Sequence, residues 1–297
     1  MRKDLKNMIA AKNNRFNLPI SNVAVCIIGC WRTGDVLIDY IRDFFLVNPN
    51  VNVHFYLYLK SFDTMTGDEN SVPDHDPEAL ERRIKRSLGN HLIDLRIITH
   101  SEPLSSIYLP VFSNITEVVH MKSMEEKRRG IVYDLVWIMR PDLIMYPSNY
   151  FEKFLKYFNQ SHQNSRRFEV PHGREIYMYP LMGKDASSIV PEYQDTVMCG
   201  SSVAVDLLAN SMLTHIGETL DYKDLEFIDL TDAKGRLHEG LYYAVEKYDI
   251  IRTSFPELEY NRNKSHIPLG MTIMRKDDPW AERGYFNIKD LNERFDL

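Results

Sequence analysis

Cysteine, long apolar runs and an excess of positive charge are scarce or missing in this sequence. Its three cysteines among 297 residues are too few for the disulfide framework of a small secreted protein, and reduced, buried thiols are expected. No apolar stretch approaches the roughly 20 residues of a membrane-spanning helix. Residues 1–21, a basic arm, lack the apolar segment of a secretory signal. These absences predict a soluble cytoplasmic protein without a membrane span.

The charge balance is acidic, with 36 Lys and Arg against 42 Asp and Glu and a formal net charge of −6 at pH 7. A protein of this charge has no global basic field to draw in DNA or an anionic membrane. Two short runs, "EKRRG" at 126–130 and "SRR" at 165–167, could still form local basic patches. Nucleic acid therefore stays an alternative partner that the net charge does not favour.

Several catalytic and nucleotide-binding motifs are also missing. The sequence has no G-x-G-x-x-G fingerprint and no G-x-x-x-x-G-K-[ST] phosphate loop, which argues against a dinucleotide-dependent enzyme and a P-loop kinase. Its histidines lack zinc-ligand spacing. The "GSS" around Ser201 is not the G-x-S-x-G elbow of a serine hydrolase.

The chain opens with a pattern typical of an α/β fold. "VAVCIIG" at 23–29 is a short β-rich run, the apolar positions of 35–47 recur at helical spacing, and "VNVHFYLYL" at 51–59 is a second strand. A strand, helix and strand in this order favour a parallel sheet with right-handed crossovers. The fold class is therefore α/β.

The rest of the chain continues in the same way. The expected elements are a helix at 77–89, a strand at 92–100, a helix at 115–129, a strand at 131–140, a helix at 148–160, a strand and serine-capped helix within 194–212, and a helix at 237–250, with an irregular tail after Phe255. No repeat and no Gly/Ser-rich linker divides the chain. One domain at 22–255 is expected, with 256–297 packed on it as an extension.

Two polar segments follow predicted strands, where open α/β sheets bind ligands. In "GCWR" at 29–32, Gly29 permits a close backbone approach and Arg32 could bind a phosphate, although for this segment alone a tight turn with an exposed arginine is the favoured interpretation. In "MRPDL" at 139–143, Arg140 and Asp142 would share one face if the strand persists. They could bind a pyrophosphate and a metal or sugar hydroxyl, or form a salt bridge with each other.

Weaker candidates lie elsewhere in the sequence. Asp195 precedes a short apolar run, and His238 and Glu239 open a predicted helix. Each has an ordinary structural explanation, since aspartate is common in turns and a carboxylate is favoured in the first turn of a helix. "DHDPE" at 74–78 contains a D-x-D, but its position indicates a helix cap rather than a metal site.

The order of these pieces resembles glycosyltransferases of the GT-A type, in particular WavE-like and related uncharacterised families of bacterial polysaccharide clusters, viruses and plants. The segments that carry the resemblance are "VAVCIIGCWR" (23–32), "VNVHFYLYLKSFD" (51–63), "YDLVWIMRPDL" (133–143), "YQDTVMCGSSVAVDLLAN" (193–210) and "HEGLYYAVEKYDI" (238–250). The sequence departs from the family pattern twice. Ile138 stands where one version of the motif is basic, and Asp142 alone represents the metal-binding D-x-D.

The resemblance implies a single Rossmann-like GT-A domain with a mostly parallel central sheet and helices on both faces. It implies a hexosyl- or pentosyltransferase that moves a sugar from a nucleotide-sugar, such as a UDP-sugar, to a hydroxyl acceptor such as a glycan. The implied donor-binding residues are Gly29, Trp31, Arg32, Arg140 and His238, and the implied catalytic residues are Asp142, Asp195 and Glu239. A divalent cation, Mn²⁺ or Mg²⁺, would bind at Asp142, and metal dependence is left open.

Two alternatives stay open beside this interpretation. One is a viral or phage glycosyltransferase that modifies a hydroxymethylated base in DNA. The other is a nucleotide- or sugar-binding module without catalysis, since a shared fold does not fix function. In each case the expected location is the cytoplasm of a bacterium or an infected host cell. The sequence does not determine the sugar, the acceptor, the stereochemical outcome or the oligomeric state.

Overall fold

The computed structural model describes residues 20–31, 34–61, 75–99, 109–146, 149–165, 175–181, 192–219, 251–254 and 270–273, and the findings below concern these residues. The chain begins with β1 (Asn22–Cys30), α2 (Gly34–Phe45) and β2 (Asn52–Lys60). The two strands are parallel neighbours, in register from Asn22 opposite Asn52 to Cys30 opposite Lys60. The predicted β-α-β opening is therefore confirmed.

The next unit is α3 (Pro77–Leu88), the short 3-10 helix η1 (Gly89–His91) and β3 (Leu92–Ile98). Asp76 caps α3, because its carboxylate accepts hydrogen bonds from the backbone N–H groups of Glu78 and Ala79. This satisfies two donors that the first turn of a helix leaves unpaired. The interpretation of "DHDPE" as a helix cap is confirmed.

The remaining elements follow in the order α4 (Leu109–Arg129), β4 (Leu135–Met139), β5 (Leu143–Tyr146), α5 (Tyr150–Ser165), β6 (Glu175–Leu181), β7 (Glu192–Gly200), α6 (Ser202–Thr219), β8 (Ile251–Ser254) and β9 (Gly270–Ile273). Ser201 caps α6 as expected, since its Oγ accepts the backbone N–H of Ala204 at 3.1 Å. The predicted helix at 237–250 lies outside the described residues. No helix in the described part of the chain is long and apolar enough to span a membrane.

Seven strands form the main sheet in the order β3-β2-β1-β4-β7-β6-β8. Within it β7 pairs antiparallel with both β4 and β6, whereas the other neighbouring strands are parallel. A mostly parallel sheet is thus confirmed. A second, two-stranded sheet pairs β5 with β9 antiparallel. This corrects the expectation of an irregular tail after Phe255, because a four-residue strand paired with a distant partner carries little periodicity of its own.

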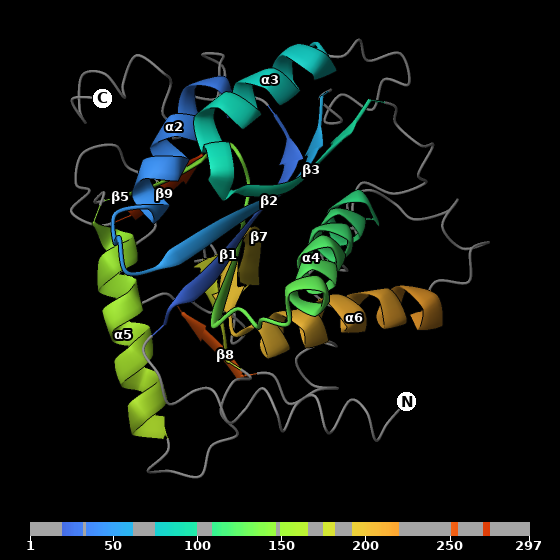
Figure 1. Ribbon diagram of the computed structural model, residues 1–297. Helices are drawn as coiled ribbons and strands as arrows, with labels where there is room; N and C mark the ends of the chain where they lie inside the picture. Colours follow the sequence, from blue (N-terminus) through green and yellow to red (C-terminus); the bar gives the residue numbers. More distant parts are fainter. Residues whose placement is uncertain are drawn as a thin grey trace.

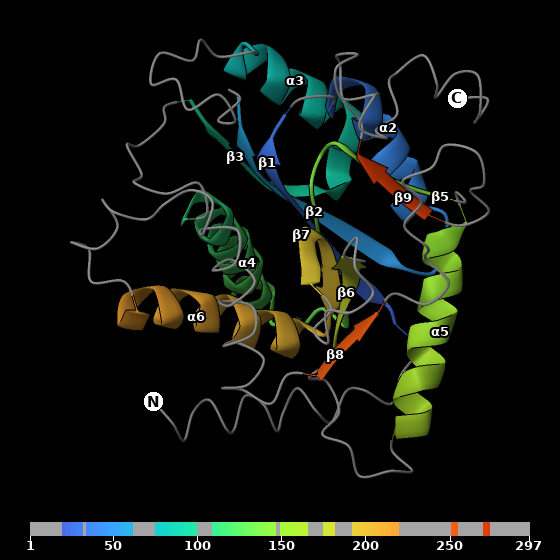
Figure 2. The same ribbon diagram turned by 180° about the vertical axis from the view of Figure 1, so that it is seen from behind.

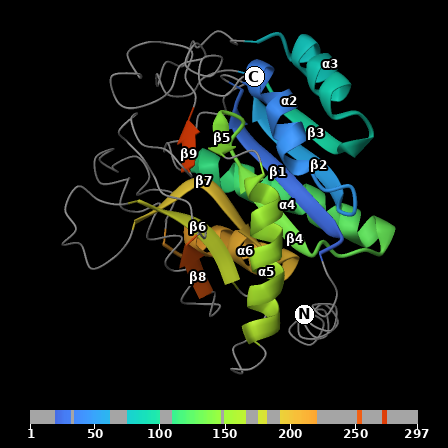
Figure 3. The same cartoon turned by 90° about the vertical axis from the view of Figure 1, so that its left-hand side faces the viewer.

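Helices cover both faces of the main sheet, as expected (Figures 1 and 2). On one face α2, α3 and α5 enclose the larger core, and on the other α4 and α6 lie side by side over the smaller one (Figure 3). Strand alternation divides the two cores, since Val25 and Ile27 of β1 face the first core and Cys26 and Ile28 face the second. Because β1 is buried on both faces, its sequence is a continuous apolar run.

Candidate functional site

The candidate site lies at the carboxyl edge of the main sheet. The parallel strands β1, β2, β3 and β4 all end at this edge, at Cys30, Lys60, Ile98 and Met139. From β1 the chain adds β2 and β3 on one side and then places β4 on the other. This reversal between β1 and β4 is the position at which open α/β sheets bind ligands. The structure therefore brings the two polar segments predicted from sequence to neighbouring strand ends.

At the end of β1, Gly29 has a φ of 107°, a conformation that residues with a Cβ rarely adopt. A Cβ at this position would meet no atom within 4 Å, so the backbone conformation, and not lack of space, explains the glycine. The side chain of Trp31 is only 1% exposed and belongs to the larger core. The indole lies so close to Gly34 that a Cβ there would overlap the ring. Trp31 thus anchors this loop, and Arg32 lies outside the described residues.

At the end of β4, Arg140 and Asp142 form a two-point ion pair. Arg140 donates from Nε to Oδ1 of Asp142 at 2.9 Å and from Nη2 to Oδ2 at 2.7 Å. The Asp142 side chain is 1% exposed and that of Arg140 is 24% exposed. The strand stops at Met139, so the turn at Pro141, rather than strand alternation, brings the two side chains together. The sequence left open whether these two residues bind a ligand or form a salt bridge with each other. In the structure they form the salt bridge.

This pairing determines what Asp142 does in the structure. Both of its oxygens accept from the guanidinium, so the carboxylate orients Arg140 and offsets its charge. No group of three or more His, Cys, Asp or Glu side chains suited to a metal ion occurs within the described ranges. Among the described residues Asp142 therefore belongs to no such group, and its charge partner is Arg140.

Asp195 lies in β7, which runs antiparallel to β4 with Val197 opposite Met139. Its backbone consequently lies toward the same carboxyl edge as Arg140. The register of β7 with β6 shifts at this point, from Met198 opposite Met178 to Gln194 opposite Tyr179. Register irregularities of this kind are common next to active sites. The orientation of the Asp195 side chain and the whole of His238 and Glu239 lie outside the described residues.

Lys60 is a residue at this edge to which sequence reasoning gave no role. It closes β2 directly opposite Cys30 of β1 and is only 9% exposed. Burial lowers the pKa of its ammonium group, and the charge interaction with Cys30 offsets part of that effect. The sequence held one signal for it, a lysine that ends an otherwise apolar and aromatic strand, "VHFYLYLK". Cys26, Cys30 and Cys199 form no disulfide.

The basic runs lie away from this edge. "EKRRG" ends α4 close to the start of β1, since the backbone N–H of Asp134 donates to the carbonyl of Asn22. The end of α5, which opens "SRR", lies near Ile20, whose N–H donates to Oδ1 of Asn159. Both runs therefore begin at the amino edge of the sheet, and Arg166 and Arg167 lie outside the described residues.

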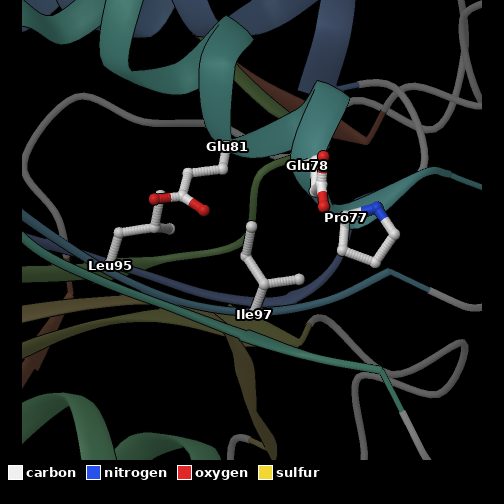
Figure 4. Close-up of a pocket in the computed structure, with 5 residues that line it drawn as sticks. All are labelled: Pro77, Glu78, Glu81, Leu95 and Ile97. Atoms are coloured by element: carbon white, nitrogen blue, oxygen red, sulfur yellow. The ribbon is translucent and has the colours of Figure 1, made fainter.

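A shallow pocket of about 200 Å³ lies between α3 and the edge strand β3 (Figure 4). Glu78 and Glu81 lie over Leu95 and Ile97 there, and Pro77 closes one end. Leu95 and Ile97 pack against the larger core, so this pocket is on the α2 and α3 side of the sheet. It contains none of the predicted site residues, and its two carboxylates do not suit an anionic ligand.

Comparison with known proteins gives no assignment, because no family model matches the sequence and no curated protein matches it. The residues at the carboxyl edge are therefore the features of this chain that bear on its function.

Proposed function

We propose that the protein is a glycosyltransferase of the GT-A type, which moves a sugar from a nucleotide-sugar to a hydroxyl acceptor. The observation that carries the proposal is the Arg140 guanidinium, which a buried carboxylate holds in place at the ligand-binding edge of the sheet. This pair lies beside the reversal of strand order between β1 and β4. The mostly parallel sheet with helices on both faces agrees with the domain that the sequence resemblance implies.

In this proposal Arg140 binds the diphosphate of the donor. Its Nε and Nη2 donate to Asp142, which fixes the plane of the guanidinium at the carboxyl edge, where its positive charge can attract a phosphate. Negative charge builds up on that phosphate as the sugar leaves. A fixed cation therefore stabilises the transition state more than the bound substrate. By the resemblance, Arg32 in the loop after β1 adds a second positive charge.

Transfer forms a bond between the acceptor oxygen and the anomeric carbon of the sugar. The bond from that carbon to the phosphate oxygen breaks, and its electron pair leaves with the nucleoside diphosphate. In an inverting reaction the acceptor proton passes to a carboxylate, for which Asp195 or Glu239 is the candidate. In a retaining reaction the same carboxylate orients the acceptor, and the acceptor proton passes to the departing phosphate oxygen. The position of the Asp195 backbone at the carboxyl edge supports its inclusion.

A panel of UDP-, GDP-, CMP- and TDP-sugars tests the proposal. One donor class should raise the melting temperature by mass action, and its nucleotide should be released when acceptor is present. Arg140→Lys should slow release by roughly 10²-fold, because a lysine lacks the planar fork. Arg82→Lys, at an exposed position on α3, is the matched control and should release nucleotide at the wild-type rate. If no nucleotide-sugar binds, the proposal is wrong.

The non-catalytic module is the second candidate, and the engagement of Asp142 with Arg140 favours it. A module of this kind would bind a nucleotide-sugar at the same edge without breaking it. Binding that raises the melting temperature but never releases nucleotide, with any acceptor offered, would support the module over the transferase. The DNA-modifying alternative needs positive charge next to the candidate site. The two basic runs begin at the amino edge of the sheet, so none of their described cations lies next to that site.

A further inference from the structure

We propose that Lys60 is a diphosphate-binding residue, which together with Arg140 contacts the phosphate groups of the nucleotide donor from the two strands that flank β1. The identity of the anion rests on the glycosyltransferase function proposed above. The placement of Lys60 rests on the fold, the strand register and the burial of its side chain.

The strand register places the two cations on either side of β1. Lys60 ends β2 opposite Cys30, and Arg140 directly follows Met139, which lies opposite Ile27. Since neighbouring strands lie about 4.8 Å apart, the backbones of β2 and β4 are about 10 Å apart across β1. Two long side chains can close that span around a pyrophosphate.

Lys60 and the residue opposite it, Cys30, lie on one side of the sheet. Tyr56 of β2, Cys26 and Ile28 of β1, and Ile138 of β4 all pack in the core beneath α4 and α6. Lys60 and Cys30 continue this face by alternation, and Arg140 follows the end of β4 at the same edge of the sheet. The charge interaction between Lys60 and Cys30 is consistent with a shared face.

The backbone at Lys60 is fixed from two directions. The N–H of Trp31 donates to the Lys60 carbonyl at 3.1 Å, and Ser61 donates from its N–H to the carbonyl of Ile98 in β3 at 3.1 Å. Since Trp31 is itself part of the core, the position of Lys60 is set before any ligand arrives. A backbone fixed in this way leaves only the side chain to be ordered when an anion binds.

Its electrostatic setting makes Lys60 receptive to an anion. The interactions it has in the structure do not compensate for its burial, because its pKa lies below the ordinary lysine value. A phosphate next to the ammonium group would favour the charged form and raise that pKa. Binding of a diphosphate should therefore be coupled to proton uptake at Lys60.

Calorimetric titrations of the full chain with UDP, GDP and inorganic pyrophosphate test this coupling. Titrations in two buffers of different ionisation enthalpy, between about pH 7 and the ordinary lysine pKa of roughly 10.4, report proton uptake. Wild type should take up protons on binding. Lys60→Met should abolish the uptake and weaken diphosphate binding by about tenfold or more, the effect of one lost charge-assisted hydrogen bond. Lys60→Arg should restore much of the affinity, and Lys85→Met, exposed on α3, should match wild type in both measurements.

The outcomes separate this inference from the proposed function. If a nucleotide-sugar is turned over while Lys60→Met binds its diphosphate like wild type, the inference is wrong and the transferase stands. If pyrophosphate binds with uptake that depends on Lys60 but no sugar is transferred, the phosphate site stands and the transferase falls. Should Lys60→Met not fold, wild-type binding without proton uptake would by itself overturn the inference.

Discussion

Two lysines on the same side of the sheet, Lys122 and Lys60, are both almost fully buried, yet their surroundings differ. Lys122 of α4 donates to Glu126 at 3.0 Å, to Ser202 at 2.7 Å and to Asp206 at 2.6 Å, which joins α4 to α6. Burial alone lowers its pKa, but the charges of Asp206 and Glu126 outweigh burial and raise it. At Lys60 the effect of burial prevails and the pKa is lowered.

This difference in pKa distinguishes a cation that is paired within the protein from the one that we propose binds a ligand. A buried charge is costly unless paired charges and hydrogen bonds replace the water it has lost. The cluster around Lys122 supplies that replacement within the protein, and Ser202 also donates to Glu126 at 2.6 Å. Lys60 lies at the carboxyl edge of the sheet, and burial disfavours its charged form. Strained or destabilised groups of this kind often mark functional sites.

The largest effect is expected at Lys122. Lys122→Met should lower the free energy of unfolding by about 3 to 5 kcal/mol, because Glu126 and Asp206 would lose their buried cation. Lys156→Met, which breaks an exposed pair with Glu152 on α5, should cost about 1 kcal/mol or less. Urea denaturation of both variants measures the difference. Equal costs for the two variants would mean that the Lys122 cluster is not the structural tie described here.

Asp142→Asn should have the next largest effect. The amide keeps one acceptor for Arg140 but turns a donor toward its second N–H, which should cost about 1 to 3 kcal/mol in the free energy of unfolding. Nucleotide release should fall as well, since Arg140 loses its orientation. Asp43→Asn alters an exposed Arg–Asp pair on α2 and serves as the control for both measurements. Donor binding and turnover that both survive in Asp142→Asn would show that the site is wrongly placed.

The smallest effect, and one of opposite sign, is expected at Lys60. Lys60→Met should raise the free energy of unfolding of the ligand-free protein at pH 7 by about 0.5 to 1 kcal/mol, a gain typical of relieving a functional strain. The folded-state pKa of Lys60 lies below its unfolded value. Wild type should therefore gain stability as pH rises through the folded pKa toward the unfolded one. Denaturation at several pH values should show the advantage of Lys60→Met shrinking over that range, and a loss of stability in Lys60→Met would contradict the contrast with Lys122.

The positions of the polar segments after β1 and β4 followed from sequence, because their elements are recognisable locally. Apolar runs and helical spacing identify β1, α2 and β2, and cap residues such as Asp76 mark helix starts through short-range hydrogen bonds. From a β-α-β opening, a mostly parallel sheet and its ligand-binding edge follow by general rules of chain connection. The pairing of β5 with β9 did not follow, because neither short strand carries a pattern that names its partner.

The sequence by itself determined the α/β class, the order of the early elements, and the ends of β1 and β4 as the candidate site. These features depend on interactions between residues that are close together in the sequence. Only the tertiary structure decided that Asp142 pairs with Arg140, that Asp206 of α6 pairs with Lys122, and that Lys60 lies buried beside Cys30. Each of these depends on distances and loss of solvent between segments far apart in the chain. Burial and pairing, which set the charge state of a lysine, arise only when those segments meet.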